Sequence, residues 1–148
     1  MLRIVFVIAA LALGIGAIVA HPQDIAARRE LMKRSGEQAK IGGLMTRGDL
    51  PFDLAKAQTI FTVFAEKAEK LPRLFPEDSR NGDTRAKPAI WEKPEEWKAA
   101  ISKFADDTKA AHAQTTDFAT FKAAFGSVSR NCLTCHEVFR GAPRHHHH

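Results

Sequence analysis

Apolar residues recur at intervals of three and four along three segments of the chain, and no segment alternates strictly as a half-buried strand would. The first segment lies between the letters PFD and LP, the second follows Pro94, and the third starts near the candidate caps Thr116 and Asp117. Their apolar lines are Leu54, Ala57, Phe61, Phe64, Ala68 and Leu71; Trp97, Ile101, Phe104, Thr108 and Ala111; and Phe118, Phe121, Phe125, Val128, Cys132, Cys135 and Phe139. The pattern predicts three helices, each with one buried face.

A fourth segment, residues 24–47, lacks proline and is rich in helix-forming residues, yet its inward line is polar and small. That line runs through Ile25, Arg28, Met32, Ser35, Ala39 and Gly42. Because such a line cannot fill a core by itself, we expect something bulky other than side chains to lie against this helix. Residues 72–93 form the long connection, and the other two joints are short. The chain is therefore predicted to be all-α, an antiparallel four-helix bundle.

The chain begins with a candidate export signal. Arg3 is followed by seventeen uncharged residues that end in small side chains before the letters HPQD. This predicts a secretory signal peptide over residues 1–20, cleaved after Ala20. An uncleaved anchor is the alternative, because seventeen apolar residues are close to the shortest stretch that spans a bilayer. In both cases the folded part faces an exported compartment, which in a bacterium is the periplasm, and after cleavage no membrane span remains.

The rest of the chain is long enough for one domain with a core, which we place at residues 21–144. Residues 145–148, the letters HHHH, are either a purification tag or native sequence and are left out of the fold prediction. Without Arg3, the Lys and Arg residues exceed the 17 acidic residues by a formal charge of +4. This charge is mild and dispersed, with no basic run between aromatic residues, so it does not support nucleic-acid binding.

The candidate chemistry lies near the end of the chain, in the letters SRNCLTCHEVFR, which contain both cysteines of the protein. Residues three and four apart share a helix face, so Cys132, Cys135 and His136 point the same way. Two thiols so placed can reach the two vinyl groups on one edge of a porphyrin, and the imidazole behind them can reach its iron. Cys-x-x-Cys-His is the spacing of covalent c-type haem attachment.

Two other chemistries use paired cysteines, and each lacks a requirement here. A thioredoxin-like redox pair needs a βαβ pattern nearby and a position at a helix N-terminus, but this pair stands in the last turns of a helix. A structural zinc site needs four ligands, and His21 and His112 are the only other histidines outside the terminal run. The motif therefore favours a bundle that encloses one covalently bound haem c.

Three stretches, FKAAFGSVSRNCLTCHEVFR, AKPAIW and GLMTRGDLPFD, resemble the class II cytochromes c, the cytochrome c′ family, and the resemblance extends over about residues 24–140. It implies a four-helix bundle with haem between the helices, thioether bonds from Cys132 and Cys135, and His136 as the proximal iron ligand. It also implies that Arg140 lies beside that imidazole and that Arg28 pairs with a haem propionate. An ordinary solvated helix charge is the alternative for Arg28.

The resemblance is most informative at the sixth iron ligand. In gas-binding members, the residue sixteen positions before the glycine that ends the first helix is a non-ligating Leu, Phe or Tyr. Counting back sixteen from Gly48 gives Met32, which resembles the methionine-ligated, low-spin branch. Met45, near the helix end, is the competing methionine and is expected to pack in the core. Arg73 departs from relatives that often have an aromatic residue after the letters LP, which leaves the packing at that haem edge open.

If Met32 and His136 fill both axial positions, no substrate site is left on the iron, and the thioether sulfur favours ferrous iron. We therefore predict a non-enzymatic carrier of single electrons whose partners are periplasmic redox proteins. The alternative is a five-coordinate cytochrome c′ that binds nitric oxide or carbon monoxide. A disulfide-exchange enzyme would need free Cys132 and Cys135. The outer faces of the first two helices, through which relatives often dimerise, show no decisive apolar patch, so monomer and homodimer both stay open.

Overall fold

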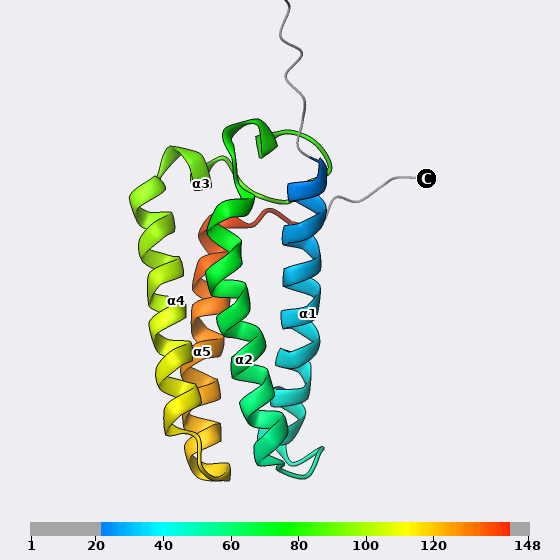
Figure 1. Cartoon of the computed structure of the whole chain (residues 1–148), viewed down its shortest axis with the longest axis vertical. Helices are drawn as coiled ribbons and strands as arrows, with labels where there is room; N and C mark the ends of the chain where they lie inside the picture. Colours follow the sequence, from blue (N-terminus) through cyan, green and yellow to red (C-terminus); the bar gives the residue numbers. More distant parts are fainter. Residues whose placement is uncertain (1–21, 143–148) are drawn as a thin grey trace, which may run out of the picture.

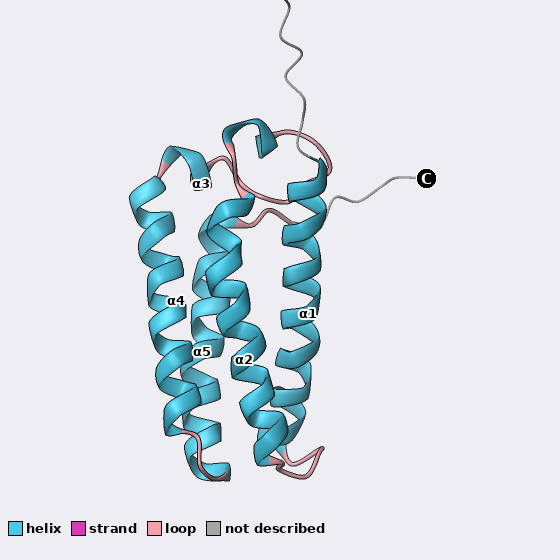
Figure 2. Cartoon of the chain, viewed as in Figure 1, coloured by secondary structure: helices cyan, strands magenta, loops and turns pink. Residues whose placement is uncertain are grey.

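Four long helices make up the protein, as predicted, in the computed structural model that describes residues 22–142 (Figure 1). The helices are α1 (Pro22–Arg47), α2 (Leu54–Lys70), α3 (Ala89–Glu92), α4 (Pro94–Gln114) and α5 (Phe118–Phe139), with 3₁₀ turns η1 (Leu71–Leu74) and η2 (Glu77–Arg80). The four long helices run side by side, with their loops at the two ends of the bundle (Figure 2). The predicted signal peptide and terminal His run lie outside the described residues. None of the helices within residues 22–142 has the length and apolar character needed to cross a bilayer.

The helix ends follow local chemistry. Asp53 caps α2, with its carboxylate accepting a hydrogen bond from the Lys56 N–H at 3.0 Å. Asp117 caps α5, and its side chain and that of Thr120 satisfy each other's backbone N–H groups in a capping box. Gly48 adopts a φ of 81° directly after α1, in the left-handed region that favours glycine at a helix end. Short-range sequence signals therefore determine where these helices begin and end.

One half of the bundle has an aromatic core. Its buried members come from all four long helices: Met45, Ala57, Ile60, Phe61, Phe64, Ala68, Phe104, Ala111, Phe121, Phe125 and Val128. The phenylalanine rings pack edge-on or tilted, as in the pair Phe61 and Phe121, whose centroids are 5.9 Å apart. Leu54 and Phe118, the first residues of two predicted apolar lines, are exposed instead, because they stand at the end of the bundle.

Helix α1 is the loosely packed member of the bundle. It packs mainly on α2, and its contact with α5 is slight. At Gly42, however, the backbone of α1 lies close to Phe125 on α5. A Cβ added at Gly42 would be only 2.3 Å from Cε2 of that ring. Nearer the start of α1 the inward residues are Arg28, Met32 and Ser35, which cannot fill the space between the helices.

The long connection between α2 and α4 is more ordered than the predicted loop over residues 72–93, because it contains η1, η2 and α3. Its last part is tied to the chain that follows α5. Ala86 and Arg140 form an antiparallel bridge, in which Gly141 N–H donates to Arg85 O at 2.7 Å and Lys87 N–H donates to Phe139 O at 3.0 Å. The connection thus closes one end of the bundle, the end at which α1 starts and α5 stops (Figure 1).

The close approach at Gly42 generates a prediction. Gly42→Ala forces the buried Phe125 ring to move, and we expect the free energy of unfolding to fall by about 1–3 kcal/mol, the usual range for overpacking. Gly36→Ala is the matched control, since nothing lies within 4 Å of a Cβ at Gly36. Replacing an exposed helical glycine by alanine should stabilise by roughly 0.5–1 kcal/mol. Urea unfolding of the haem-containing protein measures both, and equal stabilities would contradict the packing argument.

Candidate functional site

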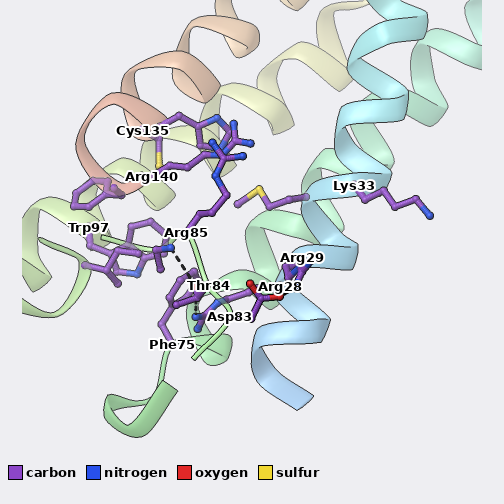
Figure 3. A pocket seen from close by; sticks show the side chains of 15 residues that line it. Arg28, Arg29, Lys33, Phe75, Asp83, Thr84, Arg85, Trp97, Cys135 and Arg140 are labelled. Carbon is purple, nitrogen blue, oxygen red and sulfur yellow. Dashed lines mark hydrogen bonds and ion pairs between the residues drawn. The ribbon is translucent and has the colours of Figure 1, made fainter. Parts of the chain in front are cut away.

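A cavity of about 420 Å³ lies between α1, α4, α5 and the long connection, a volume within the usual range of ligand pockets. It is lined by Arg28, Arg29, Met32, Lys33, Phe75, Asp83, Thr84, Arg85, Ala86, Ile90, Trp97, Cys135, His136, Phe139 and Arg140. Figure 3 shows Arg28 and Arg29 on α1 across the cavity from Cys135 and Arg140 at the end of α5. The polar and small inward residues of α1 predicted a space beside this helix, and the structure contains it. Cys135 and His136 of the predicted Cys-x-x-Cys-His motif border this space.

Helix α5 brings the Cys-x-x-Cys-His motif to this region. Cys135 and His136 line the cavity, and both are partly buried. Cys132 lies one turn earlier, packs against the aromatic core, and has its Sγ 3.7 Å from Val128 O. Both thiols are free. The helix thus presents two cysteines that are not joined in a disulfide, and an imidazole, along one line from the core to the cavity.

The surroundings of Cys135 and His136 favour the uncharged form of both side chains. Burial raises the pKa of the Cys135 thiol, against the opposing effect of the Lys67 charge. Burial also lowers the pKa of His136 to about 4, helped by the positive charges of Arg140, Lys67 and Arg85. The imidazole is therefore neutral at physiological pH, which is the form that coordinates a metal.

Met32 lines the opposite wall of the cavity, from α1. It packs with Cys135 against a second core cluster formed by Leu71, Ile90, Trp97, Ile101 and Phe139. Met45, the other methionine among the described residues, is only 1% exposed and belongs to the aromatic core. The expectation that Met45 packs in the core is confirmed, and Met32 is the methionine at the cavity.

Arg28 is not an ordinary solvated charge, because it is only 4% exposed. Its Nη1 donates to Leu74 O and Ser79 Oγ, and its Nη2 donates to Ser79 O and Thr84 Oγ1, at 2.7–3.0 Å. Its guanidinium also lies over the ring of Phe75, 4.5 Å from the centroid. Burial lowers the pKa of Arg28, against the raising effect of Asp24. Arg28 thus holds the long connection in place at the edge of the cavity.

Several lining residues escaped sequence reasoning because they stand in the long connection, where no periodicity indicates which side chains turn inward. Phe75 is the main example: its ring packs against Trp97, with centroids 4.9 Å apart, and against Trp91. Arg73, at the position where relatives often have an aromatic residue, is exposed and does not line the cavity. Phe75, two residues later, supplies an aromatic wall instead.

The structure gives no support to the two alternatives for the cysteine pair, a structural zinc site and a thioredoxin-like redox pair. Within residues 22–142, no group of three or more His, Cys, Asp or Glu side chains is placed to hold a metal ion, as a zinc site would require. The cysteines stand near the end of α5, away from the helix N-terminus that a thioredoxin-like pair needs.

Comparisons with known proteins place the chain in a family. The family described as Cytochrome C′ matches residues 23–140. A cytochrome c′ of Rhodopseudomonas palustris is 39% identical over 140 residues, 94% of this chain and 96% of that one. A cytochrome c-556 of the same species is 34% identical over 146 residues, 95% of this chain and 97% of the relative. The solved cytochrome c′ structure from that species superposes with a TM-score of 0.78 and 38% identity, covering 82% of this chain and 98% of that one.

The fold and the site define a c-type cytochrome built on a four-helix bundle. More narrowly, the chain belongs to the cytochrome c′ family of class II cytochromes c, and it carries covalently attached haem c with its iron. The residues present fit that group, since free thiols and a neutral imidazole on α5 meet an apolar cavity with a cationic rim.

The hydrogen bonds of Arg28 generate a second prediction. Arg28→Met leaves four oxygen contacts of the long connection without their donor, and we expect the free energy of unfolding to fall by about 2–4 kcal/mol. Arg29→Met is the matched control on the same helix, because the ion pair of Arg29 with Asp83 is exposed and should contribute about 0–1 kcal/mol. Thermal unfolding of both variants measures the difference. A loss no greater for Arg28→Met than for the control would show that Arg28 does not hold the connection.

Proposed function

We propose that this protein carries single electrons in the bacterial periplasm, with Cys132 and Cys135 as the thioether attachments of the haem and His136 and Met32 as the axial ligands of its iron. One observation carries the proposal. His136 from α5 and Met32 from α1 line the same cavity from opposite helices, whereas Met45 is buried in the aromatic core. Export rests on the predicted signal peptide over residues 1–20.

The side chains suit this assignment. The bound haem supplies one-electron chemistry, while the chain supplies ligands and environment. His136 is kept neutral by burial and by nearby cations, so its nitrogen is available to iron at physiological pH. Met32 offers a soft thioether sulfur, which favours ferrous iron and raises the reduction potential. With both axial positions filled, the iron has no open position for a substrate, in keeping with a carrier and not an enzyme.

Arg140 and Arg28 complete the proposed site. Arg140 lines the cavity, and its charge is the largest electrostatic contribution to the low pKa of His136, which supports a position beside that imidazole. Arg28 is among the residues that line the cavity, and a guanidinium suits a carboxylate such as a haem propionate. Because its two Nη atoms already donate to the long connection, the propionate pairing would share the guanidinium with those bonds.

Redox partners would meet the protein at the cationic rim of the cavity. Arg29, Lys33, Arg85 and Arg140 all line the cavity, and Asp83 is paired with Arg29. A rim of this sign steers partners with acidic surfaces through encounters that weaken as salt increases. The partner class we propose is therefore periplasmic redox proteins with an acidic docking face.

A second candidate is a five-coordinate cytochrome c′ that binds nitric oxide or carbon monoxide. The observation that favours it is the higher identity to the cytochrome c′ of Rhodopseudomonas palustris, 39%, than to its cytochrome c-556, 34%. This function requires that Met32 does not ligate the iron or leaves it readily. The optical spectrum of the oxidised protein distinguishes the two, because methionine ligation gives low-spin iron.

The attachment sites give a third prediction. Replacing both Cys132 and Cys135 by alanine should abolish covalent haem, and the space beside α1 would then loosen the bundle, so little folded protein is expected. Haem staining on a denaturing gel and circular dichroism measure the two effects. Thr134→Ala, an exposed position between the cysteines, is the control and should retain haem. A cooperatively folded, haem-free double variant would contradict the dependence of the fold on haem.

The sixth ligand gives a fourth prediction. The wild-type protein should be low-spin in both oxidation states and bind carbon monoxide slowly, because Met32 must first leave the iron. Met32→Ala should become high-spin, bind carbon monoxide at least about tenfold faster, which corresponds to ~1.4 kcal/mol of barrier, and have a lower reduction potential. Met45→Leu, which keeps the volume of the core, is the control and should leave the spin state unchanged. A wild-type protein that is already high-spin and quick to bind carbon monoxide would favour the gas-binding function.

A further inference from the structure

Lys67 is a lysine inside the bundle. It stands on α2 and is only 7% exposed, although lysine is among the residues that are least often buried. Its Nζ lies 4.3 Å from the ring centroid of Phe104 and 5.4 Å from that of Phe64. The ammonium group therefore lies over two aromatic rings, an arrangement that stabilises a desolvated cation.

No carboxylate balances this charge among the described ion pairs and hydrogen bonds. Its neighbour Glu66 pairs with Arg34 and Lys70 at the surface of the bundle. Burial lowers the pKa of Lys67, and the thiols of Cys132 and Cys135 act in the opposite direction. In the haem-bound protein those thiols become neutral thioethers, so the interaction of Lys67 with them is lost.

The charge of Lys67 acts on the haem-attachment helix. It opposes the rise in the pKa of Cys135 and contributes to the low pKa of His136. Its ammonium group lies over Phe64 and Phe104, two members of the aromatic core cluster against which Cys132 also packs, and Lys67 is not among the residues that line the cavity. Solvent and salt screen charges at the rim, whereas a charge in the low-dielectric interior keeps most of its effect.

We propose that Lys67 is a positioning charge that raises the reduction potential of the haem. Reduction transfers one electron from the reductant to the ferric haem, breaks no bond and moves no proton at Lys67, so the charge of the haem falls by one. A fixed cation inside the bundle repels the ferric form more than the ferrous form and thereby favours reduction. The proposal requires the bound haem but holds whether or not Met32 ligates the iron.

Potentiometric titration of the haem-containing protein tests the proposal. Lys67→Leu removes the charge without adding a sulfur ligand, and we expect a lower midpoint potential, such that the ferrous-to-ferric ratio at a fixed ambient potential falls on the order of tenfold. Lys67→Arg keeps the charge and should stay close to the wild type. Lys70→Leu, one turn away in an exposed ion pair, is the matched control and should change the ratio little.

The outcomes separate a charge effect from a structural one. Lys67→Gln gives a second neutral variant if the leucine variant does not fold, and the optical spectrum of each variant shows whether the axial ligands are unchanged. A midpoint potential equal to or above the wild type in either neutral variant, with an unchanged spectrum, overturns the proposal. So does a fall in Lys67→Arg as large as in Lys67→Leu, because it would trace the effect to packing. A high-spin wild-type spectrum would overturn the methionine ligation alone.

Discussion

The rest of the structure depends on the inability of α1 to pack fully against α5. Toward the end of α1, Gly42 lets the ring of Phe125 approach the backbone, and the two helices meet. Toward its start, the inward side chains include Arg28 and Met32, and the helices leave a cavity. The bundle therefore has one half filled by aromatic side chains and one half with a cavity, because the inner face of α1 changes from small residues to polar ones.

The long connection is held at the open half by a few polar contacts. Backbone carbonyl groups in a partly buried loop need donors, and Arg28 supplies four hydrogen bonds from a single guanidinium. The bridge between Ala86 and Arg140 fastens the other side to the end of α5. These contacts bring Phe75 and Thr84 to the cavity, so the connection forms one of its walls as well as joining α2 to α4.

Positive charge is concentrated around this site. Five Arg or Lys residues line the cavity against Asp83 alone, and Lys67 is buried over two rings of the aromatic core. Together with burial, which is the larger cause, these charges lower the pKa of His136 and keep it neutral, and they would attract the carboxylates of a haem. If the redox effect that we propose for Lys67 holds, positive charges serve both cofactor binding and redox tuning.

The sequence by itself determined the four helices, a cap of α5 at Thr116 or Asp117, and the haem-attachment motif, because each depends on spacing within a few turns of one helix. It also indicated that something besides side chains lies against α1, since the inner line there is visibly too polar. Only the tertiary structure decided that Phe75 supplies the aromatic wall, that Arg28 donates to residues 46–56 positions away, and that Lys67 lies over one ring of α2 and one of α4. The sequence does place Lys67 one turn after Phe64, at the edge of the apolar line, but the edge of a helix face is buried or exposed according to how its neighbours pack. Those contacts join elements far apart in the chain, and local spacing carries no information about them.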